Sequence, residues 1–199
     1  MTLRPKDFHA METKFPTRPP IEPRALPRIP VSVMEGLFVR GLKAEGKLAE
    51  RLLSYGYDIK KPEVSYSVLT YQRCVNAARQ EIFTHLSDEE AYRLLGRKLV
   101  DGFLETLVGK VVAVAMPMIG PARVVERLPR YCAMMGRGEM EVRIMPAGET
   151  ARRIYFGDIY NRPEFLAGAL EVGLERAHVK PIVSVEERTT EGYRLFLRW

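Results

Sequence analysis

The sequence is short of the residues that build disulfide frameworks, and it has no long apolar run. Its 199 residues include two cysteines, Cys74 and Cys132, which exclude such a framework and favour a reducing compartment. The longest apolar run, Val111–Met116, is far shorter than the roughly 20 residues that a membrane-spanning helix needs. Met1–Ala10 lacks the apolar core of a signal peptide. We therefore predict a cytoplasmic protein without a membrane span.

Histidine is equally scarce. His9, His85 and His178 are scattered along the chain, and no pair of them has the spacing of metal ligands. The glycine-rich phosphate loops, the nucleophile elbow and the HExxH zinc motif are all absent from the sequence. A nucleophilic pair of Cys74 or Cys132 with His85 is an alternative, but a free cysteine is more often a small buried hydrophobic residue. We expect no metal, no cofactor, no catalytic residue and no enzymatic activity.

Two groups of charged residues leave other functions open. Asp101 and Glu105 stand one helical turn apart and would suit acid–base catalysis in a hydrolase or transferase, although a solvated helix face explains them as well. The densest basic group consists of Arg123, Arg127, Arg130, Arg137, Arg152 and Arg153. Together with the net charge of +6, it makes a basic nucleic-acid-binding accessory protein the main alternative. Nucleic acid remains the less favoured partner, because no helix-turn-helix pattern or interleaved aromatic residues accompany the arginines.

Proline is concentrated at the N-terminus. Residues 1–31 hold seven of the 14 prolines, show no hydrophobic period, and carry six basic and three acidic residues. Each proline removes a backbone donor and disfavours helix in the residue before it. We predict a proline-rich basic arm over 1–31, extended or disordered, and a single domain over 32–199. We expect the arm to be dispensable for folding, and the sequence leaves open whether it packs on the domain.

The first part of the domain has helical periodicity. Its clearest start signal is a capping box, in which Ser87 and Glu90 satisfy each other's backbone amides. The apolar positions that follow predict an amphipathic helix to about Val108. Each glycine costs roughly 1 kcal/mol of helix propensity, so Gly96 and Gly102 inside it indicate the close approach of another backbone or a ligand beside the helix. We favour close helix packing. Further helices are expected over 47–55, 67–83, 121–131 and 163–180. Residues 109–116 could form a buried strand or a buried helix, and their flanks favour the helix.

The last third changes to strand periodicity. Apolar and charged residues alternate over Met140–Ile144 and again over Arg152–Phe156, with a turn at Pro146–Glu149 between them. After one more helix, strands are expected at 182–185 and 193–199. The order strand-strand-helix-strand-strand behind an N-terminal helical layer predicts an α+β fold. Its four strands would form an antiparallel sheet with the helices segregated to one face.

Four segments and the final residue resemble a family of proteins of this length that is expanded in myxobacteria and is known only as a domain of unknown function. They are EGLFVRGL at 35–42, EAYRLLGR at 90–97, GFLETLVGK at 102–110, IGPAR at 119–123 and Trp199. The resemblance covers about 32–199 and carries no functional residues. Gly136–Met140 departs from the family pattern, in which an aromatic residue usually follows the basic exit from the helices.

The predicted order of elements is also similar, more distantly, to three groups of domains. These are the vinyl-reductase type, the haem-nitric-oxide sensor fold, and the vesicle-tethering subunits with an acyl-chain tunnel. The sensor fold would bring a haem-ligating histidine and a Tyr-Ser-Arg signature, and this sequence shows neither. The likeness implies a non-enzymatic domain in bacterial signalling or regulation that binds a small apolar ligand or a protein partner. Neither the ligand, the partner nor the oligomeric state follows from the sequence.

Overall fold

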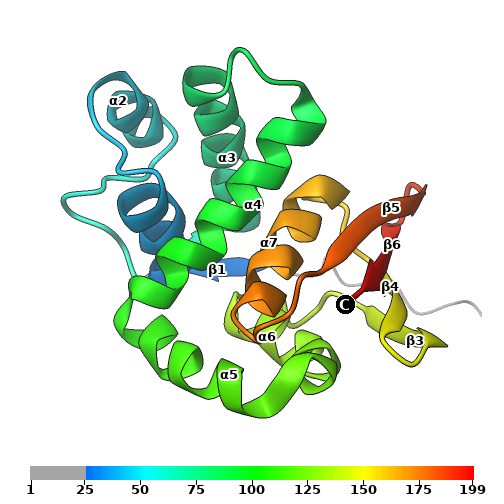
Figure 1. Ribbon diagram of the computed structural model, residues 1–199. Coiled ribbons are helices and arrows are strands. Elements are labelled where there is room, and N and C mark those ends of the chain that lie inside the picture. Colours follow the sequence, from blue (N-terminus) through cyan, green and yellow to red (C-terminus); the bar gives the residue numbers. More distant parts are fainter. Residues whose placement is uncertain (1–25) are drawn as a thin grey trace, which may run out of the picture.

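The computed structural model describes residues 26–199, which form a helical layer followed by a small sheet (Figure 1). The helical part contains β1 (Arg28–Pro30), α1 (Val31–Met34), the π-helix η1 (Glu35–Gly41), α2 (Gly46–Ser54), β2 (Ser65–Ser67), α3 (Val68–Ile82), α4 (Asp88–Glu105), α5 (Leu107–Glu126) and α6 (Leu128–Met134). The second part contains β3 (Val142–Gly148), β4 (Ala151–Phe156), α7 (Pro163–Glu175), β5 (Ile182–Arg188) and β6 (Tyr193–Arg198). The predicted α+β class and element order are confirmed.

Helix α4 is the central element, and glycines set its distance from its neighbours. A Cβ atom on Gly102 would lie 2.5 Å from the backbone nitrogen of Gly41 in η1. On the other side, a Cβ atom on Gly96 would lie 3.0 Å from the backbone nitrogen of Ala169 in α7. Both distances are shorter than an ordinary carbon contact. The prediction of close helix packing at the two glycines of α4 is confirmed, since any larger residue would push η1 or α7 away.

The four C-terminal strands form an antiparallel sheet of two hairpins, as predicted, and their spatial order is β3-β4-β6-β5. Each hairpin supplies one central and one edge strand, and α7 connects the two hairpins. Leu195 and Leu197 of β6 are fully buried, and Ile154 of β4 lies beside Leu195 in the ladder. In Figure 1 the helices lie to one side of this sheet, with α7 next to it. Apolar residues alternate with charged ones in the sequence because successive residues of a strand point in turn to the helix-covered face and to the solvent face of the sheet.

The expected domain boundary differs from the observed one. Arg28–Pro30, predicted to belong to the arm, forms strand β1 and pairs antiparallel with β2. Ile29 is only 2% exposed, and the Val31 amide donates to the Val64 carbonyl at 3.0 Å. Proline is tolerated here because β1 is short and Pro30 is its last residue, where the missing donor is not needed. The rest of the predicted arm, residues 1–25, lies outside the described residues.

Two other boundaries also differ. The helix opened by Ser87 has the full capping box but ends at Glu105, because Thr106 adopts an extended backbone and caps α5 through a 3.1 Å bond from the Gly109 amide. The turn expected at Pro146–Glu149 begins later, since β3 continues through a register irregularity to Gly148.

Candidate functional site

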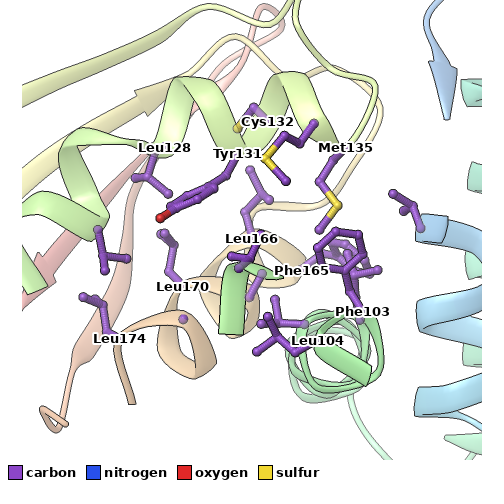
Figure 2. A pocket seen from close by; sticks show the side chains of 18 of the residues that line it. Phe103, Leu104, Leu128, Tyr131, Cys132, Met135, Phe165, Leu166, Leu170 and Leu174 are labelled. Carbon is purple, nitrogen blue, oxygen red and sulfur yellow. The ribbon is translucent and has the colours of Figure 1, made fainter. Parts of the chain in front are cut away.

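An apolar cavity of about 150 Å³ lies among α4, α5, α6 and α7. Figure 2 shows side chains of α6 pointing across this space toward those of α7 and α4. The labelled side chains are Phe103, Leu104, Leu128, Tyr131, Cys132, Met135, Phe165, Leu166, Leu170 and Leu174. Apart from Tyr71, Tyr131, Cys132 and Asn161, every residue that lines the cavity is apolar or glycine. The site is therefore suited to an apolar guest.

Small residues of α7 and a bend in α5 keep this space open. A Cβ atom on Gly173 would meet only the terminal methyl of Met116, at 3.8 Å, and Ala169 lines the same wall. Gly120 breaks α5 with φ 73° and ψ 163°, a conformation that favours glycine, and it stands between two prolines. The bend carries Val124 and Val125 back against the core, where both are buried and line the cavity. Straight helices with bulky side chains at these positions would close it.

The hydroxyl of one residue that lines the cavity is buried without a hydrogen-bond partner. The hydroxyl of Tyr71, on α3, is buried and forms no hydrogen bond with any residue of 26–199. Its ring packs edge-on against Phe38 and Phe165, which fix its orientation. Burial raises the pKa of Tyr71, so the phenol stays protonated and keeps a proton to donate. A buried hydroxyl is nearly always paired in native proteins, so this one calls for an explanation.

The polar residues next to the cavity form a buried cluster in which Arg137 Nη1, like the Tyr71 hydroxyl, has no hydrogen-bond partner among residues 26–199. The Asp158 carboxylate is buried, forms an ion pair with Arg137 at 3.1 Å, and accepts bonds from the Tyr193 hydroxyl at 3.2 Å and the Asn161 amide at 2.8 Å. Arg137 also pairs with Glu139 at 2.7 Å. Burial and the charge of Asp158 raise the pKa of Tyr193. This cluster links the loop after α6 to the sheet and holds Asn161, which lines the cavity, in place.

The cysteine chemistry considered in the sequence is not assembled. Cys74 is fully buried, and His85 lies exposed in the loop between α3 and α4. Burial raises the pKa of Cys74 to about 12 and that of Cys132 to about 11, so both remain thiols at neutral pH. A nucleophilic cysteine needs the opposite shift. Both cysteines act as hydrophobic residues, and Cys132 contributes its side chain to the cavity wall.

The charged candidates lie away from the cavity. Asp101 forms a solvent-exposed ion pair with Arg176 at 3.0 Å, and Glu105 is exposed. His178 is exposed just beyond α7, with a positive φ of 62°. Within residues 26–199, no group of three or more His, Cys, Asp or Glu side chains could hold a metal ion. The acid–base alternative therefore finds no site here.

The predicted basic group is divided by the fold. Arg137 is buried in its ion pair, Arg153 pairs with Glu186 at 3.0 Å, and Arg152 lies over the Trp199 ring at 5.4 Å. The other three, Arg123, Arg127 and Arg130, are exposed on α5, between α5 and α6, and on α6. The arginines do not form one continuous surface for a nucleic acid.

Solved structures with the same architecture are H-NOX domains. An oxygen-binding H-NOX domain related to soluble guanylate cyclases, solved as its oxygen complex, is 15% identical with a TM-score of 0.62, over 84% of this chain and 90% of that one. A Cs H-NOX mutant with an unnatural 4-cyano-L-phenylalanine is 15% identical with a TM-score of 0.63, over 85% and 95%. The Fe(II) unliganded H-NOX protein from K. algicida is 7% identical with a TM-score of 0.61, over 84% and 94%. At these identities the likeness shows the fold, and it confirms the predicted similarity to the haem-nitric-oxide sensor fold.

No curated protein is significantly similar to the chain in sequence. The family described as "Protein of unknown function (DUF2378)" matches residues 28–199, from the first residue of β1 to the C-terminal tryptophan. This match covers both the helical layer and the sheet, and it confirms the resemblance carried by the sequence motifs. The chain therefore belongs to the DUF2378 family and has the fold of an H-NOX domain.

Proposed function

We propose that the protein is a non-catalytic binding domain for a small, mainly apolar molecule that carries one hydrogen-bond acceptor. The observation that carries this proposal is the mainly apolar cavity among four helices, together with the buried, unpartnered hydroxyl of Tyr71, one of its lining residues. A ligand carbonyl, ether or hydroxyl oxygen would accept the Tyr71 proton and remove the cost of burying an unpaired donor, which is about 1–3 kcal/mol. The apolar remainder of the ligand would fill the space among the leucine, methionine and phenylalanine side chains.

The cavity volume limits the size of the guest. An apolar cavity of about 150 Å³ in another protein stays dry and binds benzene or xenon. The space here has a similar volume and mainly apolar walls. A longer ligand would need the partly buried side chains of Tyr131 and Leu166 to move, and both line the cavity. We therefore infer a ligand with a ring-sized or short-chain apolar body.

The similarity to H-NOX structures suggests haem as a candidate ligand, but the residues that line the cavity of this chain do not fit haem. The cavity is smaller than the roughly 300–1,000 Å³ of sites for drug-sized ligands. It has no histidine for the iron, and no lysine or arginine to pair with the propionates. Cys132 is held as a thiol by its raised pKa of about 11, whereas cysteine ligates haem iron as a thiolate. The proposal therefore keeps the fold of the sensor but not its cofactor.

The absence of reacting groups at the cavity supports binding rather than catalysis. No carboxylate, histidine or lysine lines it, so the lining offers no general base or nucleophile pair. We also infer a role in signalling or regulation. A bound molecule that fills the space among the four helices would change how α5 and α6 pack, and a partner could detect this change. The cytoplasmic location stays a prediction.

Native mass spectrometry of the protein purified from its own host tests the proposal. We expect a second mass that is lost on denaturation, and we expect Ala169→Phe, which fills the cavity, to abolish it. Ala133→Phe is the matched control, because Ala133 is exposed on α6 and does not line the cavity. Apoprotein alone, or an equal adduct on both variants, would refute the proposal. An absorption titration with haemin tests whether the protein binds haem instead. A Soret band that saturates at equimolar haemin would show that haem binds and would contradict our conclusion that the lining does not fit it.

A further inference from the structure

Helix α5 has an outward face that is as apolar as its buried one. Leu107, Val111, Val114 and Met118 stand at intervals of three and four residues and so form one stripe along the helix. Their side chains are among the most exposed apolar ones in the described chain: Leu107 is 87% exposed, Met118 84%, and Val111 and Val114 75% each. We call these four residues the outward face of α5. In Figure 1 the helix runs along the border of the molecule.

The fold accounts for the other side of α5 but not for this face. Gly109 and Met116 are buried, and Val112 and Met116 line the cavity. The outward face contributes nothing to that cavity. Within the described chain, α5 is the one helix long and apolar enough to cross a membrane, yet only 22% of its apolar window is buried. A contiguous exposed apolar patch is characteristic of an interaction surface.

The charges along and after this face have one sign. Lys110 lies one turn from both Leu107 and Val114, and Arg123, Arg127 and Arg130 follow along the chain. No Asp or Glu occurs from residue 107 to 125, and only Glu126 interrupts the series. All four cations are exposed, and none has an ion-pair partner within residues 26–199. Elsewhere in the described domain most arginines are paired, whereas these four cations, along the apolar stripe and after the bend that follows it, are not.

We propose that the outward face of α5 binds an anionic lipid surface, with the helix lying in the plane of the headgroups. The apolar stripe would enter the acyl boundary, while Lys110 and the three arginines would pair with lipid phosphates. A spanning orientation does not fit, because Val124 and Val125 are buried in the domain and Gly120 bends the helix between Pro117 and Pro121. A second copy packed face to face would place the same cations against each other, so charge complementarity favours lipid.

Co-sedimentation with vesicles of phosphatidylcholine, with and without phosphatidylglycerol, tests the proposal on the full chain. We expect binding only to the anionic vesicles, weakened by salt. The triple variant Leu107→Ser, Val111→Ser, Met118→Ser should lose most of this binding. Its matched control is Val64→Ser with Ile159→Ser, which changes exposed apolar residues away from α5. Circular dichroism verifies that each variant is folded.

A charge series makes the test independent of the apolar residues. Each of Arg123→Gln, Arg127→Gln and Arg130→Gln should weaken the partition coefficient by about fivefold, the usual contribution of one basic residue near an anionic surface. The control replaces Lys60, Lys61 and Lys180, which are also exposed and unpaired within residues 26–199, and should change nothing. Equal binding by the α5 variants and their controls would overturn the proposal. So would a concentration-dependent dimer that the serine variant abolishes, or binding to duplex DNA that exceeds binding to vesicles. None of these residues lines the cavity, so the result does not depend on whether a ligand binds there.

Discussion

Gly102→Ala tests whether the contact between α4 and η1 is as tight as the structure shows. In an exposed helix this substitution would raise stability by about 0.5–1 kcal/mol through helix propensity. Here the new Cβ atom would lie 2.5 Å from the Gly41 nitrogen and closer still to the Gly36 carbonyl oxygen. Ordinary contact begins at 3.4 Å, and both neighbours are backbone atoms that cannot rotate away. Helices α4 and η1 would have to separate by roughly an ångström.

The expected net effect is destabilisation. Overpacking of this kind typically costs about 1–3 kcal/mol, which exceeds the gain in propensity. For a chain of this length, each kcal/mol lowers the melting temperature by roughly 2–4 °C. Urea unfolding at constant slope measures the change. The separation would also displace Phe103, which follows Gly102 and lines the cavity, so ligand binding should weaken as well.

Gly173→Ala is the matched control, because it is a glycine in the last turn of α7 whose Cβ atom would meet only the Met116 methyl, at an ordinary distance. We expect it to stabilise the protein by about 0.5–1 kcal/mol. A higher unfolding midpoint for Gly102→Ala, with unchanged slope, would refute the reasoning. Equal shifts for the two variants would show that propensity alone decides at both positions.

Three further predictions concern the described domain. Ser87→Ala should cost about 1 kcal/mol at neutral pH. The bonds from Ser87 lower the pKa of Glu90, so the part that comes from the Ser87 hydroxyl and the Glu90 carboxylate should be lost as the pH falls through that lowered pKa. The bond from the Glu90 amide to the Ser87 hydroxyl does not titrate, so the gap between the urea midpoints of wild type and variant should narrow in acid but not close. Asp158→Ala should cost about 3–5 kcal/mol in urea unfolding, since it removes the buried partner of Arg137 and leaves only Glu139 near the surface to pair with it. A loss below about 1 kcal/mol would contradict this ion-pair assignment. Deletion of residues 1–25 should leave the melting temperature nearly unchanged. Deletion of residues 1–31 should lower the unfolding free energy by at least about 2–5 kcal/mol, the usual cost of truncating a buried isoleucine such as Ile29. Equal melting temperatures of the two truncations would show that β1 does not unfold cooperatively with the domain.

Local signals in the sequence were sufficient for most of the fold. The capping box at Ser87 depends only on residues within one helical turn, and the alternation in the last third depends only on the side of the sheet that each residue faces. The glycines of α4 were informative because their propensity cost had to be offset by something, and the structure shows the backbones of η1 and α7 there. Each of these features depends on residues that are close in the sequence or has a cost that is visible there, so it can be predicted before the fold is known.

The cavity and the outward face of α5 could not be predicted in this way. Which valines of 107–118 line a cavity and which face solvent depends on where α5 lies against α7, a contact between distant segments. The unpartnered state of Tyr71 likewise depends on residues far away in the chain. Strand β1 was missed for a related reason, since proline content indicated an arm while the pairing partner β2 lies more than thirty residues further on.

The most direct test of the central claim is a crystal structure of the protein purified from its own host without refolding. We predict continuous density for a small molecule in the cavity among α4, α5, α6 and α7. One of its polar atoms should lie within hydrogen-bonding distance of the Tyr71 hydroxyl oxygen, about 2.5–3.0 Å. An empty cavity with Tyr71 paired to a protein group, or haem bound in this space, would contradict it.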